Sequence, residues 1–591
     1  MKNKNGFTLV ELLAVIAILA ILVIIALPNV LNMYIKARKS AFLTETKTIY
    51  KEAEKKYISG NITNTDVKVI DSENDTRLDM TGEKLRYCIV LDNSGKVELL
   101  KASNGKYVVD VYKDDDLTSF DLDRVKEGNL DNYKCNGVVP PKSTSCTYDG
   151  ELVQGAEFVQ EKFTYRYMQD GKYVGDGKSI AWKNMATDGW GVQLTDKTST
   201  DSIVAETCTY INGKPVVSAA MMFSMSQASS IDLSKMNTSN IISFEGTFSV
   251  SETKNINLKN VDTSNVIDFS AMFESSKVES LDVSNFDTSK AKYMDYMFNY
   301  VAATTINGIG NFDTKNVESM VRTFAHTKTI NIDIKNFDTR KVKNMSGLFA
   351  YSKVKSLDLR NFDTSNVEYM SNMFDACDAT LIDTSSFDTS NVTTMFAMFW
   401  GTKIDTIDVS NFNTSKVIDM SQIFSSSTAT KIIGLEKLDT SNVLSMAQMF
   451  RETNFTSIDL SNFNTSKVVD MSRMFRDSKM TKLDVSSFDT SSVKTMLQMF
   501  NRSAATEIIG LDKFDTSNVT TMQYMFNVSV AEVLDLSSFD ITNTSDIKYM
   551  FNACKSKIGY ARDEETVAKF IDNSVTSIPS TLKFSVKKSS N

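Results

Sequence analysis

The chain has 591 residues, of which 42% are hydrophobic and 23% charged, and its formal net charge is −8. This length exceeds the roughly 100–200 residues of one domain, so we expect several modules or a repeat array with additions. Interspersed charges with a negative balance argue against nucleic acid as a partner, because such a binder needs a basic surface. His326 is the only histidine, which leaves no multi-histidine metal site and no conventional catalytic relay unless that ring serves. We expect His326 to be a surface or inter-repeat residue, and we expect no metal and no cofactor.

The N-terminal segment joins a basic leader to a long apolar run. Residues 1–35 read MKNKNGFTLVELLAVIAILAILVIIALPNVLNMYI, and the run over residues 7–31 is interrupted only by Glu11. At 1.5 Å per residue, its 25 residues can cross the ~30 Å hydrocarbon core of a bilayer. An ordinary secretory signal has a shorter apolar core, so a simple membrane anchor is the stronger alternative. A lone glutamate in hydrocarbon costs roughly 2.5–3.5 kcal/mol, however, and needs a reason to be there.

The stretch GFTLVELL resembles the signal of type IV prepilins and pseudopilins. The resemblance implies that a prepilin peptidase cuts between Gly6 and Phe7 and methylates the new N-terminus at Phe7. It also implies that Glu11 meets the free amine of a neighbouring pilin subunit, which removes most of the cost of burying the carboxylate. Pro28 matches a proline found in many pilin helices. We therefore expect the inner (cytoplasmic) membrane as the location before assembly, and a pilus or pseudopilus on the bacterial surface after it.

Three further segments precede the repeats. Beyond the apolar run, apolar residues recur at helical spacing, so one helix is expected over residues 7–58 with Gly60 as its stop. Residues 59–138 alternate as short strands divided by Asn-Gly and Asn-Ser-Gly turn signals, which predicts a small pilin-like β domain. Residues 139–145 are expected to form an extended linker, and residues 146–214 a β-rich module that caps the array.

Cysteine positions suggest two disulfides in an exported chain. Cys88 and Cys135 bracket the predicted β domain, and Cys146 and Cys208 form a second candidate pair. Closing such loops would contribute a few kcal/mol, chiefly by restricting the unfolded chain. Two buried free thiols are the alternative to the first pair.

Thirteen repeats fill residues 215–554, and residues 555–591 follow as a C-terminal cap. Taking the Asp or Asn of each D/N-T-S motif as a marker gives positions 237, 262, 287, 313, 338, 363, 388, 413, 439, 464, 489, 515 and 540. Successive markers lie 25 residues apart except for three intervals of 26, and those repeats contain Gly308 and Gly310, Gly434, or Gly510. We expect glycine to absorb the extra residue as a bulge. A phenylalanine follows every marker by eleven residues, so the register never slips.

Each repeat predicts a strand, a polar turn and a short helix. Leu357 and Leu359 alternate with polar residues, which is strand periodicity. Positions i, i+3 and i+7 then carry Val367, Met370 and Phe374. That spacing predicts one face of a short helix, and Ser365 with Glu368 has the pattern of a capping box. Stacked copies bury one another's apolar faces, which predicts a solenoid. The expected fold is multidomain α+β: a long pilin helix, a small antiparallel β head, and a leucine-rich-repeat-like β/α solenoid of about 25 residues per repeat.

The phrase SLDLRNFDTSNVEYMSNMF at residues 356–374 resembles the repeats of bacterial leucine-rich-repeat surface proteins of the BspA type. The resemblance covers residues 215–554 and implies adhesion to a host or neighbouring-cell surface, not catalysis. With the prepilin signal, it implies a minor pilin-like surface adhesin and no enzyme. The alternative is a membrane-anchored surface receptor or structural protein that does not polymerise.

The candidate binding face consists of side chains that point outward from the predicted strands: Asp282, Asp333, Asp358, Arg360, Asp408, Asp459, Asp484 and Asp535. A regular acidic face can dock a large partner through many weak contacts. It can equally serve solubility alone, and both interpretations stay open.

Other columns have structural interpretations. The marker aspartates suggest turn capping more than calcium binding, because calcium needs 6–8 converging oxygens. The methionine column suggests a soft core and not a metal site. Cys377 and Cys554 are expected to be small, inward-facing and reduced.

Overall fold

A computed structural model of the chain describes residues 9–62, 68–73, 77–78, 85–113, 115, 117–118, 122–130, 135, 141–169 and 188–587, and in the N-terminal helix it describes the side chains of residues 30–58. The chain divides into two compact units, Met1–Lys142 and Ser143–Asn591. The division falls inside the segment 139–145 that the sequence predicts as a linker.

Unit 1 is a long helix packed on an antiparallel sheet. The helix α1 (Leu9–Ile62) contacts β3 and β4 of a sheet with the order β1-β2-β3-β4-β5. The sheet consists of β1 (Val69–Asp71), β2 (Arg86–Leu91), β3 (Val97–Ser103), β4 (Tyr107–Tyr112) and β5 (Lys126–Glu127), with a 3-10 turn η1 (Leu122–Arg124) before β5. The helical spacing of Phe42, Ile49 and Ala53 places all three in the buried core of this unit.

The helix is longer than predicted. It continues past Gly60 to Ile62, so the predicted stop at Gly60 is wrong. Glycine costs a helix interior about 1 kcal/mol relative to alanine but does not by itself end the helix.

Unit 2 begins with a mixed sheet in the order β6-β11-β12-β9-β8-β7. Its strands are β6 (Ser145–Cys146), β7 (Glu157–Gln160), β8 (Phe163–Met168), β9 (Gly189–Leu194), β11 (Tyr210–Ile211) and β12 (Lys214–Ser218). Trp190 is fully buried and contacts the rings of Tyr148, Phe158 and Tyr167. Ser218, the last residue of β12, is bridged to Ser243 of the next coil. The module therefore joins the array through the same backbone ladder that the array uses internally.

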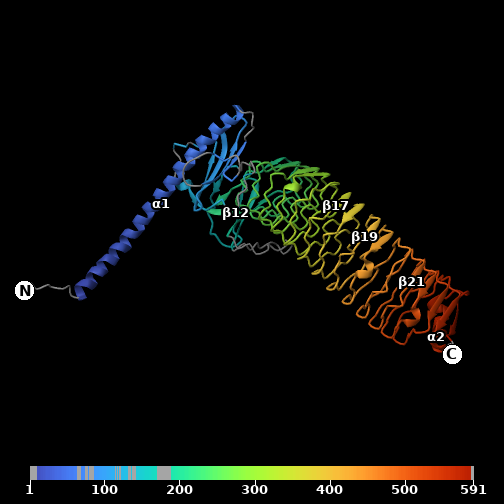
Figure 1. Cartoon of the computed structure of the whole chain (residues 1–591). Helices are drawn as coiled ribbons and strands as arrows, with labels where there is room; N and C mark the ends of the chain where they lie inside the picture. The colour runs from blue at the N-terminus through green and yellow to red at the C-terminus, as the bar shows by residue number, and fades with distance from the viewer. Residues whose placement is uncertain are drawn as a thin grey trace, which may run out of the picture. The chain divides into compact units, whose positions relative to one another are not determined.

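The repeats form a parallel β-solenoid (Figure 1). Thirteen isolated parallel bridges join one residue of each coil to the next, from Ser218 to Asp546. A second column of short parallel strands contains β10 (Ile203–Val204), β13 (Ser230–Asp232), β14 (Asn255–Asn257), β15 (Ser280–Asp282), β16 (Thr305–Asn307), β17 (Ser356–Asp358), β18 (Leu381–Asp383), β19 (Thr406–Asp408), β20 (Lys431–Ile433), β21 (Lys482–Asp484), β22 (Glu507–Ile509) and β23 (Val533–Leu536).

The last coil is closed by a cap of mixed structure. β24 (Ile558–Ala561) pairs with β23 and with β25 (Lys583–Val586), and α2 (Glu564–Phe570) and α3 (Asn573–Thr576) lie between them in the chain. Phe570 and Phe584 pack against Phe551, the last phenylalanine of the repeats. In the described part of unit 2, these two are the α-helices, so the predicted α+β and β/α labels are too helical and the array is a β-solenoid.

The short helix predicted in each repeat is absent from the described coils. Between Asn372 and Cys377, alternate N–H groups bond to the next coil, as Phe374 N does to Met398 O at 3.0 Å, while the others bond three residues back in the same coil. Asn372 and Ala376 adopt left-handed φ angles of 59° and 47°, which an α-helix does not contain. The i, i+3, i+7 spacing marks the inward side chains of this turn, and bonds between coils replace the helical bonds.

The 26-residue coils absorb their extra residue in a 3-10 turn and not in the predicted bulge. These turns are η2 (Ile309–Asn311), η3 (Leu435–Lys437) and η4 (Leu511–Lys513). Gly434 precedes η3 with φ at 84°, and a Cβ there would lie 2.2 Å from Ser410 Cα. Glycine is required both by its left-handed backbone and by the closeness of the preceding coil.

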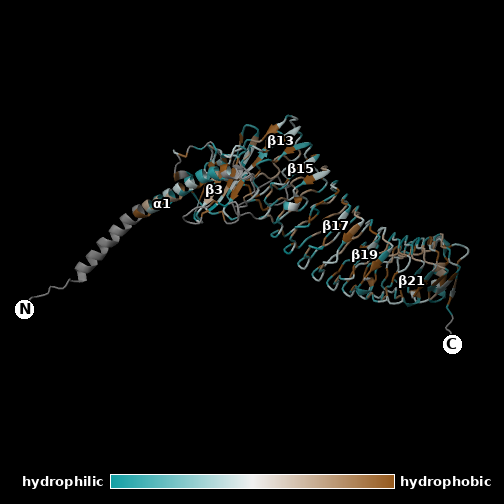
Figure 2. Cartoon of the chain, turned by 45° about the horizontal axis from the view of Figure 1, so that its top comes forward, coloured by the Kyte–Doolittle hydropathy of each residue, from teal (hydrophilic) through white to brown (hydrophobic). Residues whose placement is uncertain are grey.

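Apolar columns fill the interior of the coils. Fourteen phenylalanines from Phe223 to Phe551 stack one above another, with ring centroids 5.4–6.4 Å apart. The predicted methionine column is buried beside them, as at Met370 and Met395. Figure 2 shows hydrophobic and hydrophilic residues interleaved along the coils. One continuous core therefore connects the capping module, the array and the C-terminal cap.

A column of buried threonines forms hydrogen bonds from each coil to the next. Twelve threonines, one after each marker from 237 to 515, donate their hydroxyl to the carbonyl of the next marker. In seven of these pairs the same hydroxyl accepts the N–H of that marker. Ile541 replaces threonine in the last repeat, where no further repeat follows.

Replacing Thr389 with valine is expected to destabilise the array. The Thr389 hydroxyl bonds both the carbonyl and the N–H of Asn413, at 2.9 and 2.8 Å, and the side chain is fully buried. Valine keeps the shape but leaves both backbone groups unpaired, so we expect a loss of about 1–3 kcal/mol in urea unfolding. Thr380→Val is the matched control, because Thr380 is exposed and its hydroxyl makes no bond within the described chain. Equal losses of stability in the two variants would contradict a stabilising role for the Thr389 hydrogen bonds.

Candidate interaction surfaces

The residues predicted for processing and assembly lie outside the described part of the chain. Gly6 and Phe7 precede it, and Glu11 and Pro28 lie in α1 where only the backbone is described. Cleavage at Gly6, methylation of Phe7 and pairing of Glu11 therefore stay predictions. Where side chains are described, no helix has an apolar stretch long enough to span a membrane, and the run 7–31 lies almost wholly before them.

Both candidate cysteine pairs are disulfides in the structure. Cys88 is joined to Cys135 across 47 residues, and Cys146 to Cys208 across 62 residues. Loops of these lengths correspond to about 4 kcal/mol each in the chain-entropy account. Cys377 and Cys554 are free and buried, and burial raises the pKa of both thiols, so neither is suited to act as a nucleophile.

The marker residue of each repeat caps a turn. Its side-chain oxygen accepts the N–H two residues on, as Asp388 does from Ser390 at 2.9 Å and Asn413 from Ser415 at 3.1 Å. The hydroxyl and N–H of Ser390 lower the pKa of Asp388. This geometry is the turn capping that the sequence predicts. In the described chain, no group of three or more acidic, histidine or cysteine side chains is placed to hold a metal ion.

The predicted binding face lies on one side of the coils. Asp282, Asp333, Asp358, Arg360, Asp408, Asp459 and Asp484 are exposed, whereas Asp535 is half-buried. Parallel pairing places Asp358 directly beside Asp383, which the sequence reasoning missed. Asp232 was missed in the same way, although both share the signal of most of the others, an aspartate at the end of a strand with serine two residues later. The row is interrupted in each 26-residue coil, where Asn307, Ile433 or Ile509 takes the position.

Most carboxylates of this row already have partners. Eight of them accept the N–H of the residue two positions on. Arg360 makes two hydrogen bonds to Asp358, and its guanidinium lowers the pKa of that carboxyl to about 2. Asp535 forms an ion pair with Lys587 of the C-terminal cap. The row therefore has a structural role in most of the coils that carry it, and it leaves only outward oxygens for a partner.

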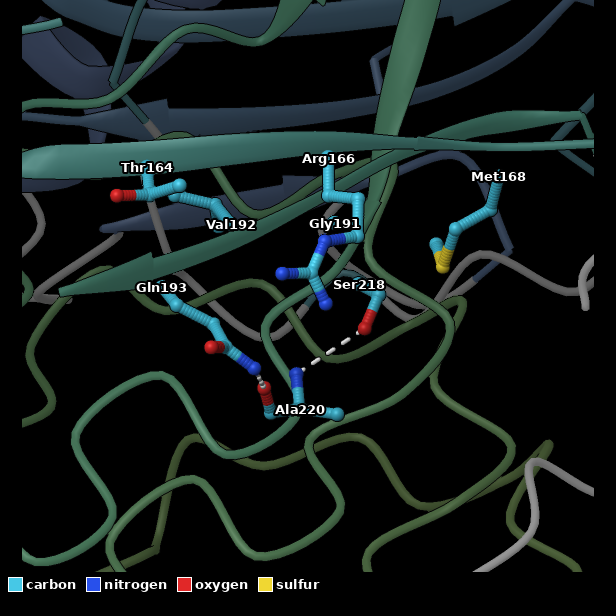
Figure 3. A pocket seen from close by; sticks show the side chains of 8 residues that line it. All are labelled: Thr164, Arg166, Met168, Gly191, Val192, Gln193, Ser218 and Ala220. Carbon is cyan, nitrogen blue, oxygen red and sulfur yellow. Dashed lines mark hydrogen bonds between the residues drawn. The ribbon is translucent and has the colours of Figure 1, made fainter. Parts of the chain in front are cut away.

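Two hollows lie at the start of the array. One, of about 640 Å³ including open solvent, follows the strand face over the first coils and is lined by Ser230, Ile231, Asp232, Asn255, Ile256, Asn257 and Ser280. Figure 3 shows the other, of about 310 Å³ including open solvent, between β8, β9 and the first turn of the array. There Gln193 Nε2 donates to Ala220 O at 3.4 Å, and Arg166 Nε donates to Glu157 Oε2 at 2.9 Å.

Aromatic residues outside the repeat motif form a cluster that the sequence reasoning missed. The His326 ring stacks between Tyr300 and Tyr351, with centroids 3.7 and 4.5 Å away, and Trp400 lies 6.4 Å from Tyr351. Equal spacing after the markers was the available signal: Tyr300, His326 and Tyr351 each follow a marker by 13 residues. His326 is thus an inter-repeat residue at the surface.

The N-terminal motif and the solenoid together define a surface repeat protein with a prepilin-like signal. The description "prokaryotic N-terminal methylation motif" matches residues 1–27, and it implies processing by a prepilin peptidase and assembly with pilins in general. The chain belongs to the family described as "Mycoplasma protein of unknown function, DUF285", which matches residues 217–307, 300–406, 402–509 and 478–563, more than half of the chain. No curated protein and no solved structure matches it.

Exchanging marker aspartates for asparagine is expected to flatten the acid sensitivity of the array. Hydrogen bonds from the serine hydroxyl and N–H two residues on lower the pKa of Asp388, Asp439 and Asp489. A carboxyl with a depressed folded pKa stabilises the fold above its unfolded value, about 3.9, and this contribution is lost as the pH falls further. We expect Tm to fall below about pH 4, with a shallower fall in the triple variant Asp388→Asn, Asp439→Asn, Asp489→Asn.

The natural markers Asn413 and Asn464 cap the same turn, so the triple variant should fold. Calorimetry between pH 7 and pH 2 measures both curves. An unchanged slope in the triple variant would show that the marker carboxylates do not cause the acid sensitivity.

Proposed function

We propose that this chain is a minor pilin-like surface adhesin, inserted by its N-terminal helix into a type IV pilus or pseudopilus. The solenoid is the part displayed for binding a protein or cell surface. We also propose that the chain acts without catalysis. The observation that carries the proposal is the joining of a prepilin-type motif at residues 1–27 to a surface-type repeat array in one chain.

Several features support this assignment. GFTLVELL places Glu11 five residues into the cleaved chain, where its resemblance to pilins gives it an assembly partner. Two disulfides fit a location outside the cytoplasm. The repeats resemble those of BspA-type surface proteins, which act in adhesion, and a stack of coils offers a long surface for many weak contacts. A head this large would crowd a fibre if every subunit carried it, so we propose a sparse or tip position.

Fibre incorporation is tested by the state of the N-terminus. We expect surface fibres sheared from cells and purified to contain this chain, beginning at a methylated Phe7, at far lower abundance than the major pilin. Mass spectrometry measures both the terminus and the ratio. A ratio close to one would contradict the sparse position.

The Glu11→Ala variant separates assembly from simple anchoring. We expect it to be cleaved after Gly6 but to be lost from the fibres, because alanine cannot meet the amine of a neighbouring subunit. Asp358→Asn, in the array of unit 2, is the control and should be incorporated normally. Unchanged display of Glu11→Ala on the surface would favour a membrane-anchored receptor that does not polymerise.

Adhesion is tested by removing the array while keeping the pilin portion. We expect cells whose chain ends after residue 142, at the boundary between the two units, to assemble the shortened subunit but to attach to target cells several-fold less. Attachment is counted by microscopy after washing. Attachment equal to that of the full chain would contradict the adhesive role of unit 2.

A further inference from the structure

Side chains that neither bond nor pack between coils show where the surface of the array differs from the repeat consensus. The repeat motif recurs because its residues bond or pack between coils. The left-handed turn has two outward positions, 9 and 13 residues after each marker, and both vary from coil to coil. Its outward positions hold small or polar residues in many coils, such as Ser275, Ala376, Ser426 and Gln448. In three consecutive coils they instead hold Tyr300, His326 and Tyr351.

The three rings form a rigid column at the surface. Tyr300 is 53% exposed and Tyr351 39%, and the ring planes are within 11° of parallel. Beyond Tyr351 the next two positions of the column are Ala376 and Gly401, while Trp400 contacts Tyr351 at an angle of 40°. Small residues next to two aromatic rings can accommodate a flat, ring-shaped ligand, because the electron-rich ring faces attract its C–H groups.

Arg322 supplies a cation that makes no ion pair in the described chain, although its charge acts on the nearby Asp375 carboxyl and Tyr351 hydroxyl. Seven of the eight arginines between residues 322 and 562 have a side-chain hydrogen bond or ion pair, namely Arg340, Arg360, Arg451, Arg473, Arg476, Arg502 and Arg562. Within residues 188–587, the Arg322 guanidinium has neither. Its side chain lies over Gly347, and its charge is close enough to lower the pKa of His326, after the larger effect of burial. A guanidinium without a partner is matched in shape and charge by a carboxylate.

Hydrogen-bond capacity remains beside the column. Asn299 and Asp375 are 4% and 7% exposed, and each keeps a side-chain Oδ1 without a partner in the described chain. Asn299 precedes Tyr300 directly, and burial raises the pKa of Asp375, which lies close to Tyr351. Both oxygens are covered by protein atoms, so they lie beside the surface cluster without being open to a ligand.

The charge around the cluster favours an anion although the whole chain is negative. Lys328 is exposed, and Lys353 and Lys403 share the single carboxylate of Asp378. These three lysines and Arg322 outnumber Asp375, Asp378 and Glu274, and burial disfavours the charged forms of Asp375 and Glu274. The local field therefore attracts a negative ligand in a chain whose net charge is −8.

We propose that the aromatic cluster and Arg322 bind an acidic carbohydrate, a pyranose ring that carries a carboxylate. The rings contact the C–H face of the sugar, and Arg322 pairs with its carboxylate. The inference rests on the proposed adhesive function and assigns it a ligand class. Sialic acids and uronic acids share this chemistry, and the experiment separates them.

Binding is measured by calorimetry with the full chain in detergent. The probes are sialyllactose, a glucuronate-containing disaccharide, neutral lactose, a sulfated disaccharide and a glutamate-rich peptide. We expect one of the two carboxylated sugars to bind at least tenfold more tightly than lactose and the peptide. Equal binding of lactose would overturn the role of Arg322, and a preference for the sulfated sugar or the peptide would overturn the ligand class.

The variants copy residues found at equivalent positions of other coils. Arg322→Gln copies Gln422 and Gln498, and Tyr351→Ser copies Ser275 and Ser426, all with left-handed backbones. A lost carboxylate–guanidinium pair should weaken binding of the acidic sugar roughly tenfold or more in Arg322→Gln, with little change for lactose. Tyr351→Ser should weaken both.

Two distant variants serve as controls. Arg473→Gln changes an arginine at the same position of another coil, and Tyr549→Gln changes one ring of the stacked pair Tyr524–Tyr549. Both should bind the acidic sugar normally. If no sugar binds while the full chain still attaches cells, the ligand class is wrong and the adhesive function stands. If attachment is also independent of unit 2, the proposed function itself fails.

Discussion

Hydrogen bonding from each coil to the next is the constraint on which the rest of the structure depends. A single coil of 25 residues cannot bury its apolar side or satisfy its own backbone, so each coil needs a neighbour on both sides. Backbone bridges from Ser218 to Asp546 provide part of this, and the buried threonine column provides another part. The two ends need special solutions for the same reason. The capping module enters the ladder through Ser218, and the C-terminal cap closes it with β24 and β25.

This constraint explains why the repeat motif was so informative. Its inward spacing predicted the solenoid and the Phe374 column, and the marker aspartates were correctly interpreted as turn caps. The helical interpretation of Val367 to Phe374 failed because a spacing of three and four residues is not specific to an α-helix. Any turning backbone that directs a side chain inward every three or four residues produces the same spacing. The sequence contains no sign that alternate N–H groups bond to another coil. Non-glycine residues such as Asn372, in a left-handed conformation, gave no signal either.

The predicted binding face shows how periodicity can mislead about function. Asp358 and its equivalents were selected because they recur and point outward, yet recurrence follows from their bond to the N–H two residues on. The aromatic cluster was missed for the opposite reason. Tyr300 and Tyr351 do not follow the repeat consensus, and only the stacking of coils places residues 51 positions apart beside the same histidine ring. Residues distant in sequence become neighbours at a spacing set by the coil length.

A repeat protein of this kind therefore separates two kinds of sequence information. Positions that recur in every coil are occupied by coil-to-coil contacts, and a change at one of them acts first on stability. Positions that differ between coils make no such contact, so a new residue there changes the surface with little effect on stability. The variety of residues at the outward positions of the left-handed turn indicates this. The same framework could thus carry different ligand sites in different coils. In this chain, Arg322 and the rings around His326 are the place where departure from the repeat consensus, exposed aromatic area and an unpaired charge coincide.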